Sequence, residues 1–243
     1  MRIIKVDAID STNRFVRDLY RSEKPDDEIC VVARVQTAGK GQMGTSWQSN
    51  DGENLTCSIF LPLSDFMVEN QFYIAMSTSL GIYDTLRVLQ IPNISIKWPN
   101  DIMSYTYKVC GVLIENSIVS GRVEGAVIGI GLNVNQTEFS ELPLARSLQQ
   151  LTKKKYELDT ILEVLLKKLS HRFGQLKSKD FKKIKNAYEA VLFRKNKPST
   201  FLDVSGDTFT GIIQRVSTSG KLEVLLEDEV VKEFDLKEIK MLN

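Results

Sequence analysis

The sequence has 243 residues, with 32 Lys and Arg against 31 Asp and Glu, so its formal net charge is +1. This balance argues against a protein that coats nucleic acid through overall positive charge, and it leaves room only for a local basic patch. No apolar run approaches the roughly 20 residues of a membrane helix, and the N-terminus lacks the apolar segment of a secretion signal. We therefore expect a soluble, cytoplasmic protein without a membrane partner.

The first part of the chain predicts strands that flank one helix and a glycine-rich loop. Residues 2–9 indicate a strand, and Asp10 or Ser11 caps the helix that follows. Residues 28–36 and 54–63 are rich in Val, Ile and Cys, which is typical of strands. The helix carries its apolar side chains at helical spacing, at Phe15, Val16, Leu19 and Tyr20.

The middle of the chain predicts one long helix and then three more strands. The helix covers residues 65–89, because apolar residues recur there at helical spacing, and it ends before Pro92. The last two of the strands are joined by a hairpin at Ser120 and Gly121. The three strands are expected at 94–98, 108–116 and 122–135.

The last part of the chain changes character twice. Residues 157–192 are lysine-rich and helical in period, which indicates a helix face exposed to solvent. A small all-β module of about fifty residues follows and is compatible with a barrel. We expect a larger domain over 1–192 and the β-module over 193–243. The short strands of the module are predicted at 200–204, 208–216, 221–228 and 230–236.

Cysteine and histidine usage excludes several kinds of site. Cys30, Cys57 and Cys110 lie far apart in apolar runs, which favours reduced core thiols over disulfides or metal ligands. His171 is the single histidine, and its surroundings indicate an exposed helix face. Histidine-based triads and most zinc sites are thereby excluded, and we assign no metal ligands.

Glycines concentrate in "QTAGKGQMGTSW", residues 36–47, directly after an apolar strand. Gly39, Gly41 and Gly44 satisfy the dinucleotide pattern G-x-G-x-x-G, but that interpretation needs a helix to start inside the motif. The sequence leads into a turn and another strand instead, which argues against a dinucleotide fold. Two interpretations stay open: a loop that brings its backbone close to an anion, and a hairpin loop without a ligand.

Two further stretches favour a ligand site. "KWPND" places Lys97, Asn100 and Asp101 within one turn at a strand end, where a cation, an amide and a carboxylate suit a nucleotide and Mg²⁺. Lys108 lies at the mouth of a buried strand, and Gly111 allows a ligand to approach the backbone.

These stretches, in this order, resemble the motif set of the biotin protein ligases. The tail from Phe209 to Ile239 resembles, more loosely, the small C-terminal SH3-like barrel of that family. The resemblance implies an α+β catalytic domain of the class II synthetase type, with a mixed or antiparallel sheet and helices. It also points to the short monofunctional class without an N-terminal DNA-binding domain, so no DNA partner is expected. The matching segments are "DSTN" at 10–13, "QTAGKGQMGTSW" at 36–47, "KWPND" at 97–101, "KVCGVLIE" at 108–115 and "GIGLNVN" at 129–135.

The resemblance implies an enzyme that activates biotin with ATP and Mg²⁺ as biotinyl-5′-AMP. It then transfers biotin to a lysine of a biotin carboxyl carrier protein. The sequence does not decide between monomer and homodimer. The catalytic residues that the resemblance implies are Lys108, Asp101 and Lys40.

The binding residues follow from the same motifs. Trp98 is expected in the core, whereas Trp47 is expected to pack on the adenine. The biotin-binding set is Ser11, Thr12, Asn13, Gln36, Gly39, Lys40, Gly41, Gln42, Lys108 and Gly111. The set for ATP and the adenylate is Gln42, Trp47, Lys97, Asn100, Asp101 and Asn133.

Two positions depart from the family pattern. Gln42 stands where many members have an arginine, so its amide brings no charge to hold a phosphoryl group, and we expect the adenylate to leak more easily. The segment "IIQRVSTSG", residues 212–220, lacks the expected tighter turn, and we assign no nucleotide contact to the β-module. A lipoyl or octanoyl ligase or transferase, and a non-catalytic protein that binds the carrier, stay as alternatives.

Overall fold

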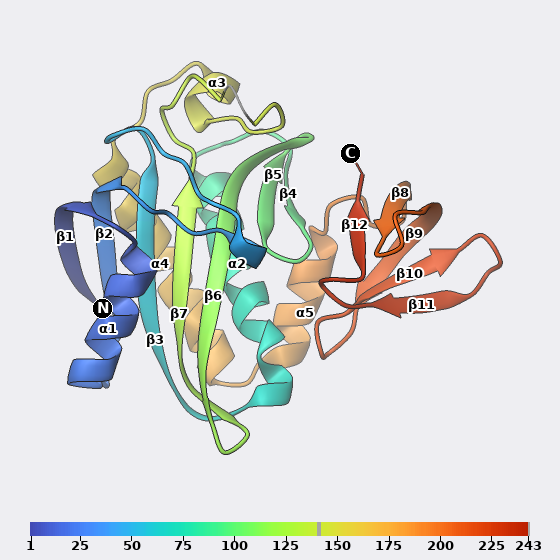
Figure 1. Cartoon of the computed structure of the whole chain (residues 1–243), viewed down its shortest axis with the longest axis horizontal. Coiled ribbons are helices and arrows are strands. Elements are labelled where there is room, and N and C mark those ends of the chain that lie inside the picture. Colours follow the sequence, from blue (N-terminus) through green and yellow to red (C-terminus); the bar gives the residue numbers. More distant parts are fainter. Residues whose placement is uncertain (140–141, 243) are drawn as a thin grey trace.

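The computed structural model describes residues 1–139 and 142–242, and within them the chain forms two β-sheets (Figure 1). The larger sheet has seven strands in the order β1-β2-β3-β7-β6-β5-β4. β1 and β2 pair in parallel, and the other neighbours pair antiparallel. The predicted mixed sheet of an α+β fold is confirmed. Its strands are β1 Arg2–Ile9, β2 Ile29–Gln36, β3 Leu55–Met67, β4 Ile94–Lys97, β5 Asp101–Ser104, β6 Tyr107–Val119 and β7 Arg122–Leu132.

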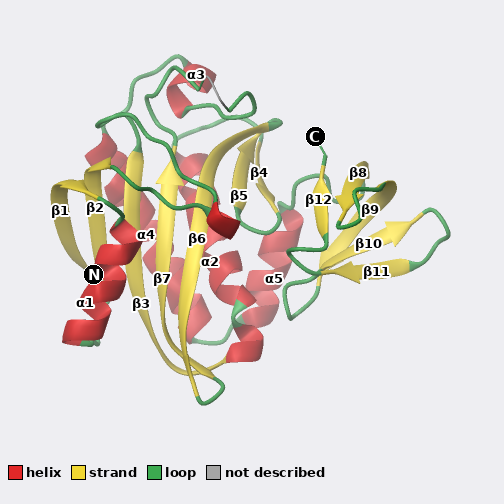
Figure 2. Ribbon diagram, in the orientation of Figure 1, coloured by secondary structure: helices red, strands yellow, loops and turns green. Residues whose placement is uncertain are grey.

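Helices cover both faces of this sheet (Figure 2). α1 Thr12–Glu23 packs Val16 against Ile29 and Val31 of β2 on one face. α2 Phe72–Val88, α4 Leu158–Lys177 and α5 Phe181–Ala190 lie behind the sheet and share the main core with its other face. Because both faces are covered, β2 is apolar along most of its length instead of alternating. A short helix, α3 Leu148–Thr152, follows the large sheet.

Two local predictions are confirmed at the turns. Ser11 is the N-cap of α1, and its side chain accepts a hydrogen bond from the backbone N–H of Arg14 at 3.5 Å. Ser120 and Gly121 form the hairpin turn between β6 and β7, with φ of 48° and 76°. Positive φ at both central residues matches the twist of the flanking strands.

The predicted helix over 65–89 is wrong at its N-terminal end. Phe66 and Met67 continue β3 beyond a register shift and pair with Val123 and Arg122 of β7. A short 3-10 turn, Val68–Asn70, intervenes before α2 starts. Apolar spacing alone could not separate the end of a long strand from the start of the helix.

Two other elements differ from the expectation. β5 was not predicted as a strand, because its four residues directly follow the "KWPND" turn. The predicted helical segment 157–192 divides into α4 and α5, with a break at Lys179, whose φ is 57°.

The C-terminal sheet has five strands in the order β11-β10-β9-β8-β12. This antiparallel sheet is consistent with the expected SH3-like module. It is not a closed barrel, because β11 and β12 are its opposite edges in the described part of the chain. β12 was not predicted. The boundary at residue 192 stays a prediction, since Phe201 and Ile213 share one core with Tyr188 of α5. The strands are β8 Pro198–Asp203, β9 Thr208–Val216, β10 Leu222–Leu226, β11 Val231–Phe234 and β12 Ile239–Met241.

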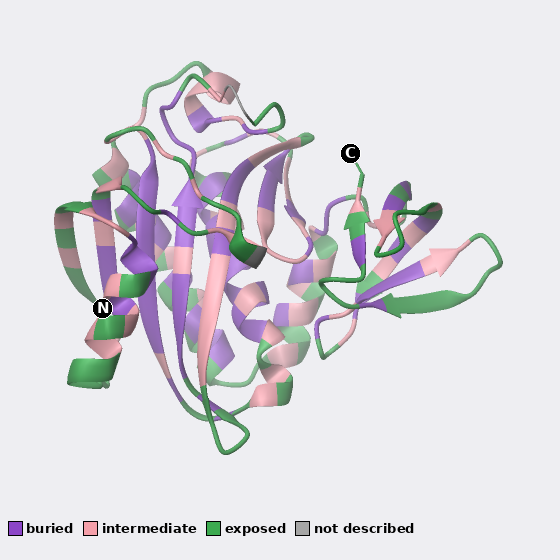
Figure 3. Cartoon of the chain, in the orientation of Figure 1, coloured by how far each residue is buried: buried purple, intermediate pink, exposed green. Residues whose placement is uncertain are grey.

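The burial pattern bears out the interpretation of the cysteines and the histidine (Figure 3). Cys30, Cys57 and Cys110 are buried and form no disulfide, and burial raises the pKa of the Cys110 thiol. His171 is exposed on α4. Among the helices within the described ranges, none is both long and apolar enough to cross a lipid bilayer.

Candidate active site

A cavity of about 470 Å³ lies on the α1 side of the large sheet, between the sheet and the loop that follows β2. Figure 1 shows this loop crossing in front of β7 and β6. β12 contributes to the cavity from the C-terminal sheet. Most residues of the two predicted binding sets line it: Ser11, Thr12, Asn13, Gln36, Lys40, Gly41, Gln42, Trp47, Asn100, Asp101, Lys108 and Gly111.

At one end of the cavity the start of α1 meets the end of β2 through side-chain hydrogen bonds. The Oε1 atom of Gln36 accepts from the backbone N–H of Thr12 at 2.9 Å and from its hydroxyl at 3.0 Å. The Oγ atom of Ser58, buried in β3, lies 2.7 Å from Thr12 Oγ1 and 2.6 Å from Asn13 Oδ1. These bonds fix the rotamers of the polar groups that face the ligand space.

A second layer holds the Asn13 amide from behind. Its Nδ2 donates to Glu115 at 2.8 Å, and the guanidinium of Arg17 donates to the other oxygen of Glu115 at 3.1 Å. A Cβ at Gly129 would lie 2.3 Å from Asn13 Oδ1, so only glycine leaves room for the amide there. Ser58, Glu115 and Gly129 were not predicted as site residues, because nothing in the local pattern shows which strand face meets α1.

The glycine-rich loop folds back on itself and places Trp47 in the site. Gly41 N–H donates to the carbonyl of Thr45 at 2.7 Å, and Trp47 N–H donates to the carbonyl of Gly39 at 2.9 Å. The indole packs over Gly131 of β7, where a Cβ would lie 2.3 Å from the ring. Trp47 Nε1 is buried and has no hydrogen-bond partner among the described residues.

At the other end of the cavity several lysines converge on one carboxylate. The Nζ atom of Lys108 lies 2.7 Å from Asp101 Oδ1. The neighbouring Lys97 is half-buried, and this burial lowers the pKa of its ammonium group. Lys108 and Lys240 lower that pKa further, whereas Asp101 opposes them. The amide of Asn100 donates to the carbonyl of Val112 and ties this turn to β6.

Lys240 was missed by the sequence analysis, which assigned no contact to the β-module. It is exposed on β12 and lines the cavity. Its position depends on how the second sheet packs beside β4 and β5, and no local sequence signal reports that packing.

Three predicted residues are not part of the cavity wall: Gly39, Lys97 and Asn133. Gly39 lies at the base of the loop, where a Cβ would be 2.4 Å from the carbonyl oxygen of Trp47. Asn133 is 3% exposed, and its amide donates to the carbonyl of Arg146 at 3.4 Å. The ligand roles of these residues stay predictions.

A larger hollow of about 810 Å³ lies on the C-terminal sheet. Lys232 is the single cation among its described lining residues, and carboxylates dominate the wall, so it is unsuited to an anionic ligand. The carboxylates are Asp203, Glu227, Asp228, Glu233 and Glu238. We therefore place the site in the smaller cavity.

Solved structures of similar fold include biotin protein ligase from Aquifex aeolicus in complex with biotin and ATP. It is 27% identical, with a TM-score of 0.83, and the match covers 100% of this chain and 99% of that one. A biotin--[acetyl-CoA-carboxylase] ligase from Paracoccus denitrificans is 28% identical over 200 residues, which cover 79% of this chain and 82% of that protein.

The bifunctional ligase/repressor BirA of Bacillus subtilis is 28% identical over 193 residues. The match covers 77% of this chain and only 58% of that relative's length. A sequence model of the biotin/lipoate A/B protein ligase family matches residues 6–133, which is more than half of the chain. The chain therefore belongs to the biotin/lipoate A/B protein ligase family.

Proposed function

We propose that the chain is an ATP-dependent biotin protein ligase. It would form biotinyl-5′-AMP and then transfer biotin to one lysine of a biotin carboxyl carrier domain. The observation that carries the proposal is that one cavity joins a wall of hydroxyls and amides to a wall of lysines, under a glycine-rich loop. The first wall suits an uncharged polar ring, and the second suits two anions that must be brought together.

In the first step a biotin carboxylate oxygen attacks the α-phosphorus of ATP. A new P–O bond forms, the bond to the β-phosphate breaks, and pyrophosphate leaves. Both reactants are anions, so the step needs fixed positive charge and tight positioning. We assign this role to Lys108 at the cavity wall, with Lys40 on the loop and Lys97 and Lys240 beside the phosphates.

In the second step the amine of the carrier lysine attacks the acyl carbonyl. The C–O bond to the phosphate breaks, AMP leaves, and an amide forms. A free lysine has a pKa of about 10.4, so it must lose a proton to become a nucleophile. We assign Asp101 as the acceptor of that proton, because it is the only carboxylate among the described residues that line the cavity.

Biotin would bind with its ureido ring at the end formed by Ser11, Thr12, Asn13 and Gln36. Hydroxyls and amides both donate and accept, which matches a ring with one carbonyl and two N–H groups. Val112, Leu113 and Ile130 line the same cavity and suit the aliphatic chain that leads to the carboxylate.

Mg²⁺ fits this site as the counter-ion of the nucleotide. Within the described residues, no three Asp, Glu, His or Cys side chains converge on a metal-sized site. Mg²⁺ typically takes one or two carboxylates and otherwise phosphates and water. Asp101 and Asn100 would hold it at the cavity wall, where the ion neutralises phosphate charge when bound.

The test combines two measurements. Pyrophosphate release from ATP is measured with biotin, lipoate or octanoate, and we expect release with biotin alone. Mass spectrometry of a biotin carrier domain incubated with the protein, ATP, Mg²⁺ and biotin should then show one added biotin. Release with lipoate or octanoate would favour the lipoyl or octanoyl ligase, and no release with any acid would contradict an adenylating function.

A further inference from the structure

The tryptophan of the "KWPND" turn reaches across to the C-terminal sheet. Trp98 is 8% exposed, which confirms its predicted core position. Its Nε1 also donates a buried hydrogen bond of 2.9 Å to the backbone carbonyl of Gly220, which is 122 residues away in the chain. Gly220 belongs to the segment that departs from the family pattern. A residue between Lys97 and Asn100 is therefore bonded directly to the turn between β9 and β10.

The turn that receives this hydrogen bond is held in one place. Gly220 has φ of +93°, and a Cβ there would lie 2.4 Å from the ring of Phe72 at the start of α2. Ser217 N–H donates to the carbonyl of Lys221 at 2.8 Å, and Gly220 N–H donates to the carbonyl of Ser217 at 3.1 Å. The Gly220 carbonyl is therefore a fixed acceptor for Trp98.

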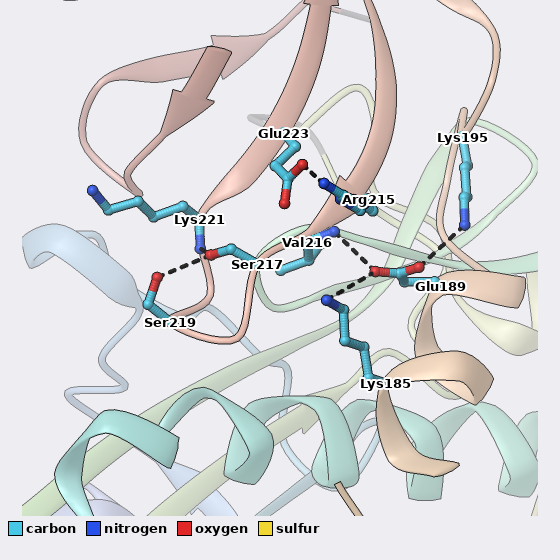
Figure 4. Close-up of polar contacts among 9 residues, drawn as sticks. All are labelled: Lys185, Glu189, Lys195, Arg215, Val216, Ser217, Ser219, Lys221 and Glu223. Carbon is cyan, nitrogen blue, oxygen red and sulfur yellow. Dashed lines mark hydrogen bonds and ion pairs between the residues drawn. The ribbon is translucent and has the colours of Figure 1, made fainter. Parts of the chain in front are cut away.

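A carboxylate of α5 anchors the strand that leads into this turn (Figure 4). Glu189 is only 14% exposed, and its Oε1 accepts from the backbone N–H of Val216 at 3.1 Å. Its Oε2 lies 3.3 Å from Lys195 Nζ, and its Oε1 lies 3.9 Å from Lys185 Nζ. Two cations thus hold the carboxylate against the strand end.

The same junction also fixes β4, which precedes the "KWPND" turn. The backbone N–H of Ile96 donates to the carbonyl of Val191 at 2.9 Å, and Phe193 N–H donates back to the Ile96 carbonyl at 2.8 Å. The segment after α5 therefore holds the backbone one residue before Lys97, while Gly220 holds the side chain one residue after it.

We propose that the turn Ser217–Gly220, anchored by Glu189, is a positioning element of the nucleotide end of the cavity. Through Trp98 it sets the backbone that carries Lys97, Asn100 and Asp101. None of Trp98, Gly220 or Glu189 lines the cavity, so they act through the turn and not on the ligand. The inference rests on the proposed ATP-dependent function.

The main test is Trp98→Phe, which keeps an aromatic ring in the core and removes the Nε1 donor. We expect the KM for ATP in biotin-dependent ATP–pyrophosphate exchange to rise roughly fivefold to tenfold, the effect of one hydrogen bond. The Kd for biotin without ATP should change less than about twofold, because the polar end of the cavity does not contact this turn.

Glu189 supplies a second, graded test of the same chain of contacts. Glu189→Gln keeps an oxygen acceptor for Val216 N–H, so the KM for ATP should stay within about twofold of the wild type. Glu189→Leu leaves that N–H without a partner and should raise the KM for ATP as Trp98→Phe does. If Glu189 only stabilised the fold, the two variants would not differ in their KM for ATP in this way.

The matched control is Phe209→Leu, on a ring that stacks between Phe201 and Phe234 in the C-terminal sheet, away from the turn. It should lower the melting temperature without raising the KM for ATP. If Trp98→Phe and Glu189→Leu leave that KM unchanged in an active protein, or raise it no more than the control does, the positioning role is wrong. If the wild-type protein shows no biotin-dependent exchange, the proposed function itself fails.

Discussion

At the end of the cavity formed by α1 and β2, polar side chains already bond to one another. At the end formed by β5, β6 and β12, Lys108 pairs with Asp101, and Lys97 lies within electrostatic reach of Asp101, Lys108 and Lys240. The sheet order places β3 and β7 between β2 and β6, so the two ends lie on different strands of the large sheet, and β12 of the C-terminal sheet adds to the second end. At the α1 and β2 end the polar groups have hydrogen-bond partners without a ligand. The lysine end carries an excess of positive charge.

This difference shows what each end requires of a ligand. Gln36, Thr12, Ser58 and Asn13 are held by protein hydrogen bonds, so a polar ring meets groups that are already oriented. The lysines repel one another. Burial and this repulsion both lower the pKa of Lys97. Bound phosphates would remove the repulsion, so binding at this end should depend strongly on ligand charge.

The largest effect is expected from Lys108→Met, which removes one cation and leaves the polar end intact. We expect the rate of biotin-dependent pyrophosphate exchange to fall roughly 10²- to 10³-fold, as for loss of a group that stabilises transition-state charge. The Kd for biotin should change by less than about tenfold, since its ring contacts lie elsewhere. Rapid-mixing measurements give the exchange rate, and isothermal titration gives the Kd for biotin.

Lys5→Met is the matched control for this substitution. Lys5 is exposed on β1, where it pairs with Asp159 at 2.8 Å. It should leave the exchange rate unchanged. A Lys108→Met protein that exchanges pyrophosphate at the rate of the control would show that the charge required for adenylation comes from other lysines.

The opposite end is tested by Asn13→Leu, which removes the amide, while Glu115 keeps Arg17 and Ser58 keeps Thr12 as a partner. We expect the Kd for biotin to rise roughly 10- to 100-fold, because the variant loses a ligand contact and places an apolar side chain against the polar groups of Ser58 and Glu115. The KM for ATP at saturating biotin should change less than about twofold. Equal losses for both substrates would show that the two ends are not independent.

Most of the polar groups that line the cavity were predictable, because they lie within short contiguous motifs. "DSTN", the glycine-rich loop and "KWPND" each bring several cavity residues together locally. Strand composition and the hairpin at Ser120 and Gly121 predicted most of the large sheet in the same way. These signals need only a few neighbouring residues.

The supporting layer could not be predicted, because it depends on packing between distant segments. Glu115 of β6 reaches Asn13 only because α1 packs across β2, β3 and β7, and Lys240 reaches the cavity only because β12 of the C-terminal sheet lies near the large sheet. The bond from Trp98 to Gly220 joins two turns that belong to different sheets. Periodicity also failed where a strand runs past a register shift, as at Phe66.

Gln42→Arg adds a positive charge to the loop over the lysine end of the cavity. A guanidinium brings a positive charge and a bidentate set of donors to a phosphoryl group, whereas the amide of Gln42 is an uncharged donor. We expect release of biotinyl-5′-AMP from the protein to slow roughly tenfold, measured by filtration and chromatography of the free adenylate. An unchanged release rate would show that loop closure and the existing lysines already retain the intermediate.

The smallest expected effect is a pH dependence of ATP binding that originates in Lys97. Because burial, Lys108 and Lys240 lower the pKa of this ammonium below its ordinary value of 10.5, it loses its proton at a lower pH than an exposed lysine does. The charged form binds phosphate, so the Kd for ATP should rise roughly threefold as pH increases toward that lowered pKa. In Lys97→Met the Kd for ATP at pH 7 should already be raised, and this part of the pH dependence should disappear. The control Lys5→Met should behave as the wild type. If Lys97→Met keeps the full pH dependence, the titrating group is another cation at this end, and Lys97 does not face the phosphates.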